Sequence, residues 1–133
     1  MTVHELRVAL TADDYDRALA FYRDGLGLPL RETWEKEGAR GALFDAGRAT
    51  LEVLSVEHAA MVDRIEVGEP VGARVRLALE VDDSVEAAER LVVAGAELVG
   101  GPVVTPWEHR NVRLRDLDGL QLTLFTVLDP AES

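Results

Sequence analysis

The sequence predicts an α+β fold in which two βαβββ modules form curved mixed sheets around a concave cavity. The chain has 133 residues, and 47% of them are apolar, which is enough for one hydrophobic core. Residues 7–14 (RVALTADD) recur in altered form as residues 76–83 (RLALEVDD). Each copy alternates apolar and polar residues like a strand and then runs into an Asp pair that can cap a helix. We therefore expect one domain, residues 1–133, with modules at about 3–56 and 73–128 and a linker over 57–72.

The first module reads as a strand, a helix and three further strands. Apolar residues at positions 6, 8 and 10 alternate with other residues, which is the period of a strand with one buried face. The Asp pair at 13–14 supplies an N-cap, and apolar residues then follow at helical spacing until Gly25 and Gly27. Turn residues at 37–38 and 46–47 separate the three expected short strands, which span about 28–36, 40–46 and 48–56.

The second module repeats this order. A strand over 75–81 is followed by a helix from Asp83 or Ser84 to about Ala94, and Gly95 ends it. Strands are expected near 97–99, 111–115 and 120–127, with Asp118-Gly119 as a hairpin turn. The linker over 57–72 is expected to hold at most one short helical turn, and the tail over 129–133 is expected to fray.

Charge and composition exclude several classes of function. The chain carries 25 acidic and 14 basic residues, a formal net charge of −11, so neither nucleic acid nor an anionic membrane is an expected partner. No stretch resembles a membrane span or a signal peptide, and a cytoplasmic protein is therefore expected. The absence of cysteine excludes disulfides, zinc–thiolate sites and a thiol nucleophile.

Two motifs resemble the vicinal oxygen chelate superfamily. These are AFYRDGLGL at 20–28 and RDLDGLQLTLF at 115–125, set within the two βαβββ units. The superfamily includes glyoxalase I, extradiol dioxygenases, fosfomycin-resistance enzymes and the bleomycin- and mitomycin-binding proteins. The resemblance covers about residues 3–128 and implies a glyoxalase/bleomycin-resistance-like fold that pairs as a homodimer, each cavity being built from units of both chains. A shared fold does not fix the function, which has to be argued from the site.

The positions that hold a metal in the superfamily are occupied here by unsuitable residues. The resemblance maps them onto Arg7, Glu52, Arg76 and Thr123. An arginine side chain has no lone pair and repels a divalent cation, so only Glu52 could be a ligand. We therefore expect neither a metal nor another cofactor, and we interpret His58 and His109 as ordinary linker or loop histidines.

Strand alternation places Arg7, Glu52, Arg76, Gln121 and Thr123 on one face together with small apolar residues. This mixed face suits a cavity for an amphipathic small molecule. Glu52 could simply bridge the two arginines as a structural ion-pair cluster, or the surplus positive charge could bind a ligand anion. In either case the neighbouring arginines are expected to lower the pKa of Glu52.

The two tryptophans complete the candidate site. Trp34 and Trp107 occupy nearly matching places in the two modules and could stack on a planar ligand. The first hypothesis is a metal-independent small-molecule-binding protein that holds a planar, anionic metabolite or antibiotic, as in antibiotic-resistance proteins. The alternative is a glyoxalase-like lyase, isomerase or dioxygenase with Glu52 as base or metal ligand. A third possibility is a non-catalytic domain with a filled cavity that acts only by pairing with a partner protein.

Overall fold

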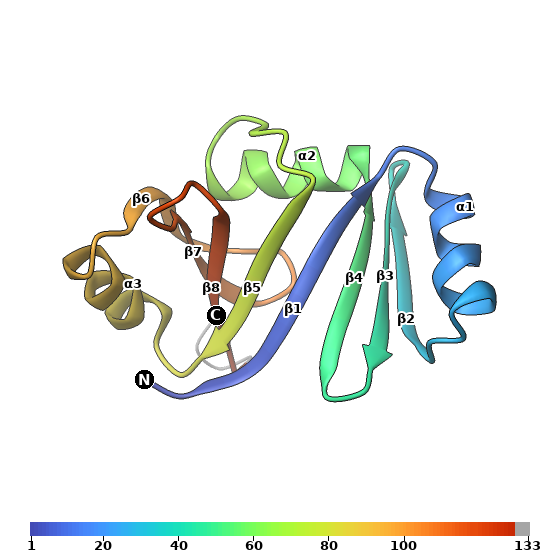
Figure 1. The fold of residues 1–133 in the computed structure, drawn as a ribbon. Coiled ribbons are helices and arrows are strands. Elements are labelled where there is room, and N and C mark those ends of the chain that lie inside the picture. Colours follow the sequence, from blue (N-terminus) through green and yellow to red (C-terminus); the bar gives the residue numbers. More distant parts are fainter. Residues whose placement is uncertain (130–133) are drawn as a thin grey trace.

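A computed structural model describes residues 1–129, in which one eight-stranded mixed sheet runs through both modules (Figure 1). The strand order is β2-β3-β4-β1-β5-β8-β7-β6, so β1 and β5, the first strands of the two modules, lie side by side at the centre. The strands are β1 (Val3–Ala12), β2 (Leu30–Lys36), β3 (Ala39–Ala46), β4 (Ala49–Ser55), β5 (Val75–Val81), β6 (Glu97–Val104), β7 (His109–Arg115) and β8 (Gln121–Val127).

The register of the central strands relates the two modules by an approximate twofold axis. Strands β1 and β5 are antiparallel, with Arg7 opposite Ala78 and Ala9 opposite Arg76. Strand β4 runs parallel to β1, and β8 runs parallel to β5 in the same way. The predicted α+β fold with two βαβββ-like modules is therefore confirmed, and the arginines at the start of each module occupy equivalent positions.

Helices α1 (Tyr15–Ala20) and α3 (Ser84–Val93) begin at the two Asp pairs, as predicted. The Asp14 carboxylate accepts a hydrogen bond from the backbone N–H of Arg17, and Asp83 caps α3 in the same manner. Helix α1 continues as a single π-helical turn, η1 (Phe21–Gly25). Each helix packs on its own module, with Tyr15 against Phe44 and Ala87 against Leu124 in the two cores.

The expectation of at most one short helical turn in the linker is wrong, because residues 56–66 form a third helix, α2 (Val56–Glu66). Its N-cap is Ser55, whose hydroxyl oxygen accepts from the backbone N–H of His58 at 3.1 Å. Figure 1 shows α2 lying across both halves of the molecule at one end of the central strands. Hydrophobic periodicity does not predict this helix, because charged and polar residues, including Asp63 and Glu66, lie on its buried side.

Strand β6 is also longer than predicted, since it extends from Glu97 to Val104 instead of ending near residue 99. The run Gly100-Gly101-Pro102 suggests that the strand ends there, but the strand continues through this run with two shifts of register against β7. Of the tail predicted to fray over 129–133, only Asp129 lies within the described residues. Within residues 1–129, no helix is long and apolar enough to cross a membrane.

Candidate functional site

A cavity of about 500 Å³ lies between the concave face of the sheet and helix α2. Both modules of the same chain contribute to it, and α2 covers it from the side opposite α1 and α3. The central strands supply Arg7, Ala9, Glu52, Leu54, Arg76, Ala78, Thr123 and Phe125, the helix supplies His58, Met61, Val62 and Glu66, and the outer strands and the β6–β7 turn supply Glu32, Trp34, Glu35, Lys36, Trp107, His109 and Asn111. Of the predicted site residues, all except Gln121 line the cavity.

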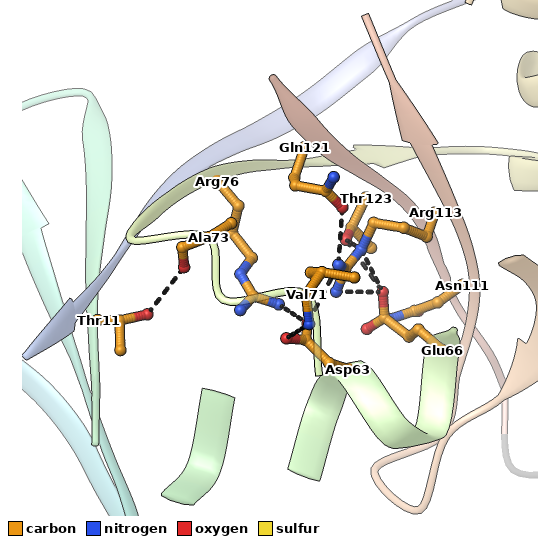
Figure 2. A network of polar contacts seen from close by, with 10 residues as sticks. All are labelled: Thr11, Asp63, Glu66, Val71, Ala73, Arg76, Asn111, Arg113, Gln121 and Thr123. Atoms are coloured by element: carbon orange, nitrogen blue, oxygen red, sulfur yellow. Dashed lines mark hydrogen bonds and ion pairs between the residues drawn. The ribbon is translucent and has the colours of Figure 1, made fainter. Parts of the chain in front are cut away.

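Arg76 is buried, with 4% of its surface exposed, and α2 provides its counter-ion (Figure 2). Its Nη1 donates to Asp63 Oδ1 at 2.7 Å. The alternative in which Glu52 bridges both arginines is therefore wrong, because the carboxylate that pairs with Arg76 is Asp63 of α2. The Nε and Nη2 atoms of Arg76 are buried and have no hydrogen-bond partner among the described residues, although such donors are normally satisfied.

Arg113 is fully buried and shares the Asp63 carboxylate with Arg76. Its Nη1 lies 3.1 Å from Asp63 Oδ1, and its Nη2 lies 3.2 Å from Glu66 Oε1. Figure 2 shows Asp63 and Glu66 projecting from α2 toward the strands that carry the two arginines. Two guanidinium groups thus face two carboxylates, which neutralises four buried charges and fastens α2 to the second module.

Thr123 and Gln121 complete this network rather than facing the cavity freely. The Thr123 hydroxyl donates to Glu66 Oε1 at 3.1 Å, although Thr123 also lines the cavity. Gln121 accepts from Arg113 Nη1 at 3.0 Å and lies outside the cavity lining. Asn111 donates to the other Glu66 oxygen at 3.1 Å. Gln121 therefore holds Arg113 in position through this hydrogen bond.

Arg7 and Glu52 lie on neighbouring strands but are only loosely paired, with Nη1 and Oε2 3.8 Å apart. Arg7 Nε lies closer to Glu5, at 3.1 Å, and its guanidinium stands over the Phe125 ring at 5.4 Å from the centroid. Burial raises the pKa of Glu52 to about 7 and outweighs the opposing charges of Arg7 and Arg76. The expected lowering of this pKa is therefore wrong, and Glu52 can take up or release a proton near neutral pH.

An aromatic group forms the other end of the cavity. Trp34 Nε1 donates to His58 Nε2 at 3.3 Å, and the ring of His58 lies between those of Trp34 and Trp107, with centroids 5.8 and 6.5 Å away. The indole of Trp34 lies so close to Gly41 that a Cβ there would collide with it. The two tryptophans that were predicted to share one site therefore do line one cavity, and a histidine from α2 contacts both of them.

Both histidines that were interpreted as ordinary linker or loop residues line the cavity, so that interpretation is wrong. Burial, assisted by the charge of Arg76, lowers the pKa of His58 to about 4. His109 stacks on Phe125 with a centroid distance of 4.9 Å, and burial together with Arg7 lowers its pKa to about 4. Both imidazoles are neutral at pH 7.

The signal that sequence reasoning overlooked lies in α2. His58, Val62 and Glu66 recur at intervals of four residues, and Asp63 and Glu66 are three apart, so these residues share one side of a helix. Ser55, directly before the helix, supplies the N-cap. This pattern predicts a helix with a polar buried face. Such a face can be recognised as buried only when its partners, such as Arg76 and Arg113, are known.

The cavity does not fit a metal ion at the positions implied by the superfamily. The guanidinium groups of Arg7 and Arg76 occupy two of them, and neither can donate an electron pair. In the part of the chain that the structure describes, no three His, Asp or Glu side chains gather in an arrangement that could hold a metal ion.

Comparison with known proteins agrees with this fold and its residue pattern. The model of the glyoxalase/bleomycin resistance protein/dioxygenase superfamily matches residues 6–124. The chain belongs to this superfamily. It is 26% identical over 127 residues to the uncharacterised protein YraH of Bacillus subtilis (strain 168), a match that covers 92% of this chain and 98% of YraH.

Solved structures share the fold at low sequence identity. A hypothetical protein from Bacillus halodurans C-125 is 17% identical, with a TM-score of 0.73 and full coverage of both chains. Methylmalonyl-CoA epimerase from Mycobacterium tuberculosis is 22% identical, with a TM-score of 0.68 over 97% of this chain and 91% of the epimerase. These two structures share the architecture of this chain, and the chemistry of this chain rests on its own cavity.

Proposed function

We propose that this superfamily member binds a small, planar anion in the cavity without a metal ion. The observation that carries the proposal is Arg76, a buried cation with two N–H groups that no described residue accepts. A ligand carboxylate satisfies both donors with one bidentate contact, which is the geometry that guanidinium groups favour. Arg7 stands at the equivalent position of the other module and adds a second positive charge to the cavity.

The remaining walls suit a planar, partly apolar ligand body. Trp34, Trp107 and Phe125 provide aromatic surfaces, while Leu54 and Met61 provide aliphatic ones. A cavity of about 500 Å³ falls within the range of small-molecule sites. Planar anionic metabolites and antibiotics are therefore the compounds to test first.

The test is a binding titration of arylcarboxylates that follows tryptophan fluorescence, with Arg76→Gln as the variant. The variant leaves Arg113 facing both Asp63 and Glu66, at 3.1 and 3.2 Å, so thermal unfolding has to establish that it is folded. Loss of charge-assisted hydrogen bonds predicts about 10- to 100-fold weaker binding. Arg74→Gln is the matched control, because Arg74 is exposed, pairs with Asp13 and does not line the cavity. Equal affinity of both variants and the wild-type protein contradicts the proposal.

A second candidate function is metal-independent proton transfer, and the pKa of about 7 at Glu52 favours it. In this reaction the Glu52 carboxylate takes a proton from a carbon next to a ligand carbonyl. The C–H electron pair moves to form an enolate, whose oxygen Arg7 and Arg76 stabilise. One structure with this fold is named as an epimerase. The test is exchange of that hydrogen for deuterium in D₂O, followed by NMR, which Glu52→Gln is expected to abolish.

We further propose that two copies pair as a homodimer, as the resemblance implies. The structure forms the cavity from both modules of one chain, so each copy in such a dimer carries a complete cavity. Light scattering coupled to size-exclusion chromatography tests this directly. A mass of two chains supports the dimer, and a mass of one chain at all concentrations contradicts it.

A further inference from the structure

His58 combines three properties that its role in the aromatic group does not explain. Its side chain lines the cavity, only 8% of the residue is exposed, and its Nδ1 atom is buried with no hydrogen-bond partner among the described residues. Its other ring nitrogen, Nε2, lies 3.3 Å from Trp34 Nε1. The two nitrogens therefore stand in different environments, one bonded and one unsatisfied.

The contact with Trp34 fixes the tautomer of His58. An indole N–H can only donate, so Nε2 has to accept and cannot carry a proton. A neutral imidazole carries one proton, which must then be on Nδ1. The indole packs against Gly41, its partner on the neighbouring strand, where a Cβ would collide with it. The structure thus holds a neutral N–H donor in the wall of the cavity at a fixed orientation.

We propose that His58 is a specificity-determining residue that donates its Nδ1 proton to a neutral acceptor atom of the ligand. This inference rests on the proposed anion-binding function and refines it. A buried donor without a partner is unfavourable, and a ligand that supplies an acceptor removes this cost. A ligand of the same shape without an acceptor leaves the donor buried and unsatisfied, so the site discriminates between the two.

Both groups belong to one cavity, because His58 and Arg76 line it together and the charge of Arg76 acts on the His58 ring. The inferred ligand therefore carries a carboxylate for Arg76 and a separate neutral acceptor for His58, on a planar body that suits the aromatic walls. An arylcarboxylate with a ketone oxygen at the para position is the simplest probe of this class.

Other roles for His58 fit the geometry less well. Its Nε2 lone pair is already engaged by Trp34, and its Nδ1 is protonated, so neither nitrogen is free to act as a base or a metal ligand. The low pKa of the ring keeps it neutral at pH 7, and the charge of Arg76 adds to this effect. The donor is accordingly available across the neutral range.

The test compares two probes of nearly equal shape, para-acetylbenzoate and para-isopropenylbenzoate, by isothermal titration calorimetry at pH 7.5. Only the first has an acceptor oxygen at the para position. The wild-type protein is expected to bind the acetyl probe at least about fivefold more tightly. His58→Phe removes the donor and is expected to abolish the preference, whereas His58→Asn, which retains an N–H near the Nδ1 position, is expected to keep part of it. Thermal unfolding of each variant establishes that it is folded.

The outcomes separate this inference from the proposed function. Equal affinities for the two probes, both reduced by Arg76→Gln, overturn the role of His58 and leave anion binding intact. Failure of both probes to bind at millimolar concentration overturns the ligand class and the anion-binding proposal for arylcarboxylates. ¹⁵N NMR of the imidazole is independent of any ligand: protonation on Nδ1 is expected, and protonation on Nε2 overturns the inference.

Discussion

Replacing Arg113 by methionine tests whether the buried charge network fastens α2 to the sheet. Arg113 is fully buried and faces Asp63 and Glu66 at 3.1 and 3.2 Å. Methionine replaces the aliphatic part of the arginine side chain but carries no charge, so the variant keeps two carboxylates with only Arg76 to balance them. Removal of one partner from a buried ion pair costs about 3–5 kcal/mol. For a domain of this size that corresponds to a decrease in Tm of roughly 10–20 °C.

Differential scanning calorimetry at pH 7.5 measures this effect, with Arg115→Met as the matched control. Arg115 lies two residues further along β7, and its Nη1 is 3.3 Å from Glu97, a carboxylate whose side chain is largely exposed. An exposed pair contributes only about 0–1 kcal/mol, so the control is expected to lower Tm by a few degrees at most. Equal and small decreases for both variants would refute the reasoning that the network holds α2 against the sheet.

Three further predictions concern the pH dependence and the aromatic wall. The pKa of Glu52 is about 7 in the folded chain and 4.5 in the unfolded chain, so the folded state binds the extra proton and stability falls as pH rises through this window. Glu52→Gln should therefore raise the free energy of unfolding by up to about 3 kcal/mol at pH 8 and by little at pH 4. Urea unfolding that shows no such gain at pH 8 contradicts this prediction. The pKa values of His58 and His109 are lowered from 6.5 to about 4, so their contribution to stability is present above pH 6.5 and is lost as pH falls toward 4. A variant with both histidines replaced by Phe should lose less stability on acidification, as followed by circular dichroism. An unchanged dependence of stability on pH argues against buried neutral histidines. Gly41→Ala forces a methyl group into the Trp34 ring, so this variant should be about 1–3 kcal/mol less stable and its tryptophan emission should be shifted. A variant with the stability and emission of the wild-type protein would show that the indole does not lie against Gly41.

Local periodicity was sufficient to predict the sheet and the two outer helices. Strand alternation placed Arg7, Glu52 and Arg76 on one face, and the Asp pairs marked the starts of α1 and α3, because both signals depend only on neighbouring residues. These features recur in both modules, and their agreement made the fold class predictable.

Helix α2 and the electrostatics of the cavity could not be predicted in the same way. The partners that make Glu66 buriable, Arg113 and Thr123, lie 47 and 57 residues away, so no local pattern reveals them. The pKa of Glu52 was misjudged for a related reason: the sequence shows the neighbouring charges but not the burial, and burial is the larger cause. Both errors arise from tertiary contacts that only the folded chain defines.

The most direct test of the central claim is a crystal structure of the protein soaked or grown with para-acetylbenzoate. The carboxylate is expected within hydrogen-bond distance of Arg76 Nε and Nη2, with the ligand ring against the aromatic walls of the cavity. A ligand bound elsewhere, or a cavity in which both Arg76 donors are satisfied by rearranged protein groups, would contradict it.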